Sequence, residues 1–395
     1  MASVNGLTWQ QRLAHLGLNS LAFLLCYVLA NAWAQQQLTV RNVALAWDAH
    51  IPFLPWMVLP YASSGLFFCA AFFLVHSPDA LRVLSQRLLL ATGIAGAIFV
   101  LLPLQFGWPR PMVASPALAA LYQGLELVDR PYNQLPSLHI AYCLLFWTSL
   151  CHRLTSPWAR VTLGGWLVLT ATSTLFTYQH HLLDVAGGLL LGWVCIACIP
   201  PGRSEPFVGL YYFVAACIAL VLGRYALPLC ATLYLVLSLG LVSLAYTRRH
   251  QDFLHKQQGQ FPWWVWCVYA PYLLGYRLTW LAVRWSGRHL PPVRRIGPQL
   301  WIGRRLTDAE ARLLPAGCSV IDLANELPET PALRAHQAPH HYQHFALLDI
   351  VPPPADTVQQ IVAAVHRETD AGRPVYLHCA MGYRRCLQIA NACTQ

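Results

Sequence analysis

The residues of this chain that could do chemistry are polar groups at the ends of apolar segments. His139 ends the tetrapeptide Pro-Ser-Leu-His, and His180 precedes Asp184 by one helical turn. Ionisable groups beside segments apolar enough to lie in a bilayer are costly and usually functional. On adjoining helices the two histidines could meet, and Asp184 could orient the ring of His180. Arg110, in the loop Trp-Pro-Arg-Pro before them, supplies a fixed cation.

This set of side chains favours phosphoryl transfer on a lipid headgroup. One histidine would attack phosphorus, the other would protonate the leaving oxygen, and the arginine would hold equatorial oxygens. A simpler interpretation is a polar pair that only joins two helices. That interpretation accounts for His180 and Asp184, but not for the ordered set that also contains Arg110 and His139.

The ordered motifs Arg-Pro, Pro-Ser-x-His and His-x-x-x-Asp resemble the type 2 phosphatidic acid phosphatases over about residues 50–200. The form Pro-Ser-Leu-His is closest to the branch shared with inositolphosphoceramide synthases. The resemblance implies phosphate binding by Arg110 and Ser137, a general acid at His139, a nucleophile at His180 and an activating carboxylate at Asp184.

Two positions depart from the family pattern. The lysine expected seven residues before Arg110 is Pro103, and the arginine expected after Ser173 is Thr174. Two phosphate-binding cations are therefore missing. The lipid substrate, and the choice between hydrolysis and transfer to a lipid alcohol, stay open.

The composition is typical of a multi-pass membrane protein, with 56% apolar and 11% charged residues. We expect eight spans, at about 12–34, 53–76, 86–106, 138–152, 159–177, 182–200, 206–223 and 226–246. The net charge of +10 does not indicate a nucleic-acid partner, because the arginines are dispersed at span ends and in the tail.

The positions of the basic residues predict the orientation. Arg82 and Arg87 fall between the second and third spans, and Arg153 and Arg160 between the fourth and fifth. By the positive-inside rule these loops are cytoplasmic. The loops that carry Arg110 and His180 then face outward.

Residues 262–285 are aromatic and long enough to span, yet they contain Pro271 and Arg277 and have basic flanks on both sides. We favour a segment that lies in the inner membrane interface, with a ninth span as the alternative. Thirteen cysteines, mostly in or beside spans, do not indicate a disulfide framework or a metal site.

From about Val293 the pattern changes to the short strands and helices of a soluble α/β domain. A buried strand at 375–378 runs into Cys379, and a helix follows Arg385. A loop between strand and helix directs its N–H groups inward and can bind an anion. Cys379 would ionise easily there and attack phosphorus, while Arg385 could hold two phosphate oxygens.

This arrangement resembles the dual-specificity protein phosphatases over about residues 293–395. The resemblance implies a nucleophile at Cys379, a phosphate clamp at Arg385, a general acid at Asp349 and a close backbone approach to phosphate at Gly382. The hydroxyl that the family has after the arginine is Cys386 here, and the chain ends ten residues after Arg385, where the family continues. We expect an apparently truncated domain with a slow second step; phosphate binding without turnover is the alternative.

The whole chain is similar to bacterial fusions of these two families. We expect an all-α multi-pass membrane domain with a six-helix lipid phosphatase core, followed by a small α/β domain. The expected boundaries are 1–250 (motifs at 105–188), an interfacial linker or ninth span at 251–292, and 293–395.

The expected activity is hydrolysis of a lipid phosphomonoester or diphosphate through a phosphohistidine, without a metal or other cofactor. The expected partners are a lipid phosphate in a bacterial inner membrane and, for the cytoplasmic tail, a phosphoprotein or small phosphoester. A phosphotransferase with the same histidine pair is the alternative. A transporter or anchor would leave the histidine pair unexplained.

Overall fold

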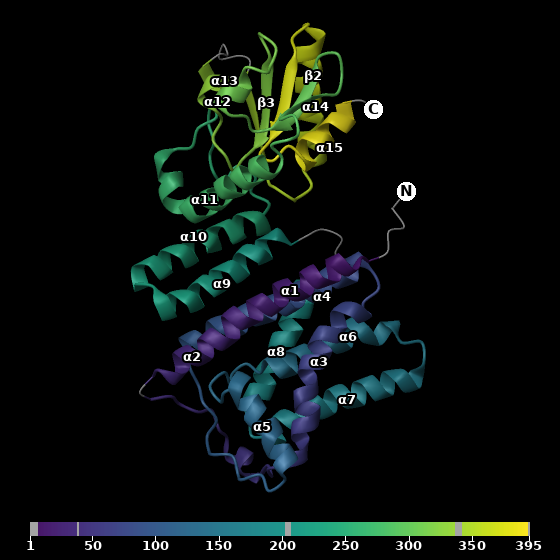
Figure 1. Cartoon of the computed structure of the whole chain (residues 1–395), viewed down its shortest axis with the longest axis vertical. Coiled ribbons are helices and arrows are strands. Elements are labelled where there is room, and N and C mark those ends of the chain that lie inside the picture. Colours follow the sequence, from purple (N-terminus) through teal and green to yellow (C-terminus); the bar gives the residue numbers. More distant parts are fainter. Residues whose placement is uncertain (1–6, 38, 202–206, 336–341, 394–395) are drawn as a thin grey trace. The chain divides into compact units, whose positions relative to one another are not determined.

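The computed structural model describes residues 7–37, 39–201, 207–335 and 342–393. The chain divides into two compact units, Met1–Val236 and Leu237–Gln395 (Figure 1). The first is helical and the second contains a five-stranded sheet. The boundaries expected from sequence, near residues 250 and 292, stay predictions.

The first unit is built from nine α-helices over its described residues. Their bounds are α1 Trp9–Phe23, α2 Leu29–Gln35, α3 Val58–Leu74, α4 Pro78–Leu101, α5 Pro116–Val128, α6 Leu138–Leu150, α7 Pro157–Phe176, α8 Leu182–Cys198 and α9 Val208–Ala226. A π-helical turn, Leu24–Val28, joins α1 to α2, and short 3-10 turns lie at Ala46–His50, Pro55–Met57 and Cys151–Arg153. Helix α10, Leu229–Thr247, begins in this unit and ends in the second.

Four helical stretches among the described residues are long and apolar enough to cross a membrane: Trp9–Gln35, Pro55–Leu74, Pro78–Leu101 and Leu229–Thr247. The eight spans predicted from sequence are therefore not confirmed. Helix α6, at 13 residues, shows one reason: at 1.5 Å per residue it covers only about 20 Å of a core about 30 Å thick.

Two arginines used to orient the spans do not lie in a loop. Arg82 and Arg87 are both inside α4, which begins at Pro78. The Arg87 side chain is buried, and its Nε donates to the carbonyl of Ile199 at 2.9 Å. Arg82 and Arg87 therefore cannot be counted as loop residues in the positive-inside rule. The predicted orientation depends on the other basic residues, including Arg153 and Arg160.

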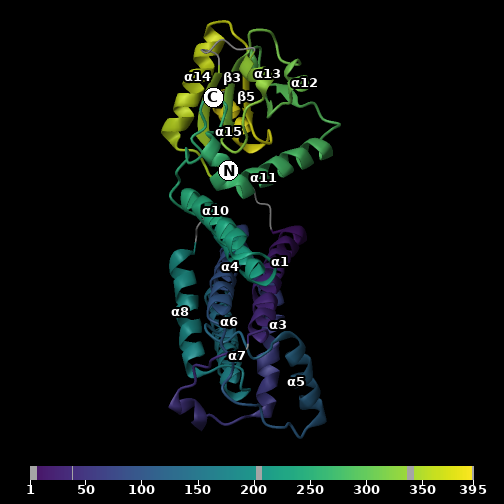
Figure 2. The same cartoon turned by 90° about the vertical axis from the view of Figure 1, so that its left-hand side faces the viewer.

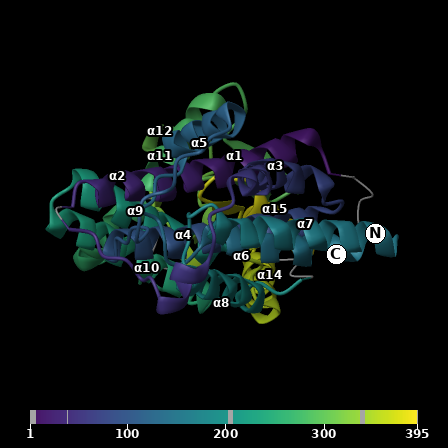
Figure 3. The ribbon, with the colours of Figure 1, turned by 90° about the horizontal axis from the view of Figure 1, so that it is seen from below.

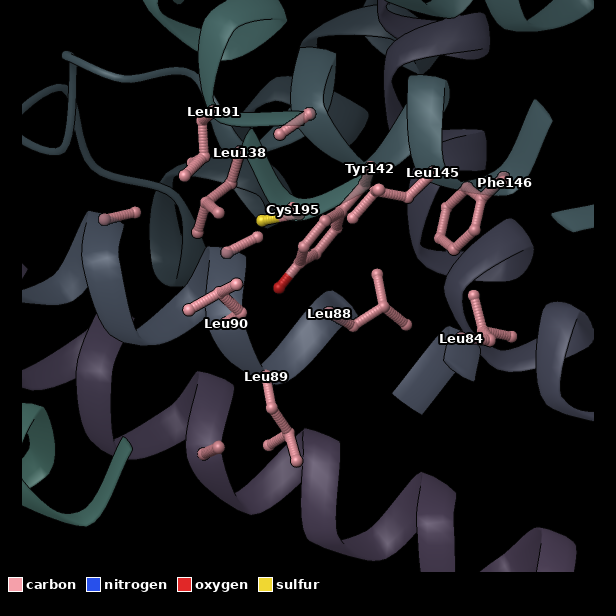
Figure 4. Close-up of a cluster of buried hydrophobic side chains, with 14 of the residues drawn as sticks. Leu84, Leu88, Leu89, Leu90, Leu138, Tyr142, Leu145, Phe146, Leu191 and Cys195 are labelled. Atoms are coloured by element: carbon pink, nitrogen blue, oxygen red, sulfur yellow. The ribbon is translucent and has the colours of Figure 1, made fainter. Parts of the chain in front are cut away.

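The core of the first unit forms where α4, α6 and α8 meet. Helix α6 packs against α4, α7 and α8 (Figure 3). Figure 4 shows Leu84 and Leu88 of α4 facing Tyr142 and Leu145 of α6. The Tyr142 hydroxyl lies 2.6 Å from Thr92 Oγ1, which gives this buried phenol a polar partner. A rigid helical core therefore stands directly behind the start of α6, where His139 lies.

The second unit is a layered α/β domain. Its elements are α11 Trp263–Ser286, β1 Val293–Arg295, β2 Leu300–Arg304, α12 Asp308–Ala311, β3 Ser319–Ala324, α13 Pro331–Ala335, β4 Tyr342–Leu347, α14 Ala355–Asp370, β5 Val375–Cys379 and α15 Arg384–Cys393. The strand order is β1-β2-β5-β3-β4, with β1 antiparallel and the other neighbours parallel. The predicted strands around 300, 320 and 376 are confirmed.

Alternation along the strands sends side chains to two different layers. Ile321, Leu323 and Leu377 pack against α14 and α15, whereas Val320 and Tyr376 pack on the face that carries α12 and α13. Figure 2 shows these helix pairs on opposite faces of the sheet. Cys379 ends the central strand β5, so it is held at the carboxyl edge of a parallel sheet, where loops bind ligands in open α/β folds.

Candidate functional site

The two histidines are brought together by close packing of α8 against the start of α6. Gly188 of α8 makes this approach possible, since a Cβ there would lie 2.5 Å from the Ser137 carbonyl oxygen and 2.7 Å from Ile140 Cβ. The Ser137 N–H donates to the Asp184 carbonyl at 3.1 Å. Ser137 is buried, and its hydroxyl has no partner among the described residues. A free buried hydroxyl is available to a ligand at this point.

The rings of His139 and His180 lie 6.0 Å apart, centroid to centroid, in a T-shaped arrangement. His180 Nδ1 lies 3.6 Å from Asp184 Oδ2, which is close but longer than a hydrogen bond. Asp184 is fully buried, and its Oδ2 accepts the His181 N–H at 2.8 Å. The structure thus gathers His139, His180, Asp184 and Ser137 in one place.

Arg110 lies beside this group, and two of its nitrogens already contact other residues. Its Nη1 contacts Glu126 of α5 at 2.8 Å, and its Nε donates to the Thr177 carbonyl at 3.3 Å. The guanidinium also lies 4.6 Å over the Tyr122 ring. The phosphate-binding role of Arg110 stays a prediction.

A buried carboxylate next to His139 was not expected from sequence. The two oxygens of Asp129 accept hydrogen bonds from the hydroxyls of Tyr27 and Tyr61. The Tyr61 hydroxyl also lies 3.5 Å from His139 Nδ1, and the two rings are 4.4 Å apart. Tyr61 therefore connects the Asp129 carboxylate to the His139 ring. No local motif pointed to this group, because its members are far apart in sequence.

His181 is a second residue that the sequence did not single out. Its ring stacks on Phe106 at 4.3 Å, and its Nε2 accepts the Gly107 N–H at 3.0 Å. Asp48, 3.7 Å from His181 Nδ1, accepts the Leu182 N–H at 2.8 Å. His181 therefore joins the loop that leads to Arg110 to the start of α8. The one feature of the sequence that could have drawn attention to His181 is its position directly after His180.

One wall of an apolar cavity of about 150 Å³ is formed by His139. The cavity lies among α1, α3, α6 and α7, and its lining is mainly aromatic and aliphatic, including Phe23, Phe67, Phe68, Tyr142, Phe146 and Leu167. Apolar surface of this kind favours hydrocarbon over water by about 25 cal/mol per Å² covered. It is suited to a hydrocarbon segment attached to the group that meets His139.

Comparison with known families gives one match, and it covers part of the first unit. Residues 86–204 match the PAP2 superfamily. PAP2 proteins are phosphatases and phosphotransferases. The matched range contains Arg110, Ser137, His139, His180 and Asp184. No curated protein and no solved structure matches the chain.

The apolar helices and the PAP2 match together fit a membrane protein with phosphoric ester hydrolase chemistry in general. The match stops before the second unit, so the chemistry of Cys379 depends on its own geometry.

Cys379 lies at the start of a tight loop between β5 and α15. Gly382 has φ of 78°, and a Cβ there would lie 2.7 Å from the Arg304 nitrogen, so only glycine fits the loop against β2. The pKa of the Cys379 thiol is lowered well below its usual value. The Cys386 thiol donates to it, and the charge of Arg385 and the N–H groups of Cys386 and Gly382 add to the effect, which outweighs burial. The loop stabilises a thiolate.

The predicted partners of Cys379 are present, but two are bound to other groups. Arg385 is buried and forms a two-point ion pair with Glu326, at 3.1 and 3.0 Å. It also donates to the carbonyls of Leu323 and Leu347 and lies 3.4 Å from Asp349. Asp349 accepts a hydrogen bond from the Tyr276 hydroxyl of α11 at 3.2 Å. The clamp role of Arg385 and the acid role of Asp349 stay predictions.

A polar network is buried on the opposite face of the sheet. Lys256 Nζ lies 2.5 Å from Asp322 Oδ2, and His378 Nε2 lies 2.8 Å from Glu329. Asp322, Glu329 and His378 are close enough to share a cation, but Lys256 and the Tyr342 hydroxyl already use Asp322 Oδ2. Lys256 fixes the segment before α11 to the sheet, a connection that the sequence did not indicate.

Proposed function

We propose that the first unit hydrolyses a phosphomonoester or diphosphate carried on a membrane lipid. The observation that carries this proposal is the apolar cavity walled by His139, next to the His180–Asp184 pair. A phosphate held between the two rings would leave its hydrocarbon part beside Phe68 and Phe146. The PAP2 match over residues 86–204 supports the phosphoric ester chemistry.

In the proposed reaction the phosphoryl group is transferred first to His180 and then to water. His180 Nε2 attacks phosphorus, an N–P bond forms, and the P–O bond to the lipid breaks while His139 gives its proton to the leaving oxygen. Water then attacks the phosphohistidine, the N–P bond breaks, and His139 takes the proton of that water. Asp184 stabilises the positive charge on His180, and Asp129 acts on His139 through Tyr61.

A screen of phosphate release from lipid phosphates, with wild type, His180→Ala and Cys379→Ser, tests this function. We expect release that depends on His180. Two labelled lipids in the same assay detect transfer, since a lipid phosphotransferase would exchange a labelled headgroup where a hydrolase releases only phosphate.

We also propose that the chain crosses a bacterial inner membrane several times, with the histidine site outward and the second unit cytoplasmic. Arg153 and Arg160 support this orientation, and a free thiolate at Cys379 suits the reducing side. Reporters fused after Ile296 and within residues 107–135 should give opposite signals. Equal signals would mean that residues 262–285 cross the membrane.

For the second unit we propose a cysteine-dependent phosphatase, supported by the thiolate loop around Cys379. The thiolate attacks phosphorus, an S–P bond forms, and the leaving oxygen takes a proton from Asp349. Water then breaks the S–P bond and returns a proton to Asp349. Arg385 would hold the phosphate oxygens after it exchanges contacts with Glu326.

Cys386 should make the second step slow. Its sulfur lies 3.7 Å from Cys379 Sγ, in the place of a hydroxyl, and a thiol is the weaker donor. In a His180→Ala background we expect a burst of product near one per protein, followed by slow turnover. Cys386→Ser should raise the steady rate several-fold and leave the burst unchanged, measured by stopped-flow phosphate release under reducing conditions. Absence of any burst would favour a domain that binds phosphate without turnover.

A further inference from the structure

Helix α11 presents an apolar stripe outward. Leu274, Leu278, Leu281 and Trp285 recur at helical spacing after the kink at Tyr269 and Pro271. Their exposed fractions include 56% for Leu274, 57% for Leu278 and 72% for Trp285. A contiguous exposed apolar face of this length marks an interaction site.

The other face of α11 is committed to the second unit. Tyr269, Tyr272, Leu273 and Trp280 are buried. Trp280 packs on Ala324, Leu327 and Ala380, and its Nε1 donates to the Arg305 carbonyl at 3.0 Å. Because these contacts fix the rotation of the helix, the leucine stripe cannot turn inward.

The helix is attached to the end of an apolar span. Helix α10, one of the four stretches apolar enough to cross a membrane, ends at Thr247. The hydroxyls of Tyr246 in α10 and Tyr272 in α11 lie 3.1 Å apart, and Phe253 packs between the two helices against Tyr269 and Tyr272. The first half of α11 is therefore held against the end of α10 and the segment that follows it.

Charges and aromatic rings on α11 match a membrane surface. Trp285 lies at the end of the apolar stripe and the exposed Arg277 lies beside it, whereas Arg284 contacts Glu310 at 3.7 Å. Arg288 extends over the Trp285 ring at 5.4 Å. Amphipathic helices that lie in the membrane interface have leucine and tryptophan on one face and arginine beside it. Each arginine near anionic lipid adds about 1 kcal/mol of attraction.

We propose that α11 lies in the membrane surface and that the Cys379 site acts on phosphomonoesters of lipid headgroups. This inference rests on the proposed phosphatase function of Cys379. A helix is about 10–12 Å across with its side chains, and an interfacial helix sinks about 5–10 Å. The inner face of α11 would then lie at the level of the lipid headgroups. Trp280 on that face belongs to the same buried cluster as Ala380, which is next to Cys379. Tyr276 of the same helix donates a hydrogen bond to Asp349.

The test uses the full chain with His180→Ala, reconstituted in phosphatidylglycerol vesicles. Three lipid phosphomonoesters, phosphatidic acid, phosphatidylglycerophosphate and phosphatidylinositol 4-phosphate, are each compared with the deacylated soluble counterpart, and with a phosphotyrosine peptide. We expect Cys379-dependent release from at least one lipid to exceed that from its counterpart at least about tenfold. Cys379→Ser supplies the background.

The double variant Leu278→Glu/Leu281→Glu should lower the lipid-to-soluble ratio about tenfold, because two apolar anchors are lost. Leu313→Glu, also an exposed leucine of the second unit but not on α11, should leave the ratio unchanged. Equal turnover of soluble and lipid substrates, with no effect of the double variant, would overturn the inference and leave the phosphatase function standing.

If no substrate gives phosphate release that depends on Cys379, the phosphatase function of the second unit is overturned, and the proposed lipid substrate is overturned with it. A photo-crosslinking residue at Leu278 tests the placement of α11 separately. Crosslinks to lipid support it, whereas crosslinks to other parts of the chain or to a second copy contradict it.

Discussion

His180→Ala should reduce phosphate release from the lipid substrate by a factor of about 10³ or more, because the proposed nucleophile is removed. His139→Ala should cost about 10²–10⁴, the usual contribution of a general acid. The double variant should be scarcely slower than either single variant, since the two rings, 6.0 Å apart, serve the same step and such effects are not additive.

Radiolabelled lipid phosphate in mixed micelles provides the measurement, and His152→Ala is the matched control. His152 is exposed and follows the end of α6, so its loss should leave the rate within about twofold. Phosphate release that survives His180→Ala at the wild-type rate would remove the phosphohistidine from the mechanism.

Lys256→Met should destabilise the second unit by about 3–5 kcal/mol, the range for breaking one partner of a buried ion pair. Both Lys256 and Asp322 side chains are fully buried, so Asp322 would lose its nearest cation and keep only the hydrogen bonds from Tyr342 and the Ala324 N–H and the more distant His378 ring. Adding Asp322→Asn should recover part of the loss, because the uncompensated charge is then gone.

Reactivity of the buried Cys318 thiol toward a maleimide in the full chain reports opening of the second unit. Asp252→Asn is the control, since both members of the Asp252–His255 pair are exposed, at 60% and 49%, and such pairs contribute less than about 1 kcal/mol. If Lys256→Met leaves Cys318 as protected as in wild type, Lys256 does not hold the sheet.

Sequence reasoning succeeded where the structure is local. The order of motifs placed His139 at the start of a helix and His180 one turn before Asp184, and the two rings lie close together in the structure. The strand before Cys379 and the helix after it follow from short apolar patterns, and both are present as β5 and α15.

It failed where partners are distant in sequence. Asp129 meets Tyr27 and Tyr61 across many residues, and neither tyrosine carries a motif. The eight predicted spans are not confirmed, because apolar content alone does not separate a long span from a short apolar helix such as α6. Helix α5, in the segment taken as a loop, supplies the Glu126 that occupies Arg110.

Lys256 is also the one lysine among the 395 residues of the sequence, and its amine is enclosed. An acylating reagent would therefore find no lysine target on the folded surface and would modify Lys256 only in molecules whose second unit has opened. The rate of acylation at Lys256 would therefore measure how often the second unit opens. The measurement could be made in an intact membrane and without any introduced label.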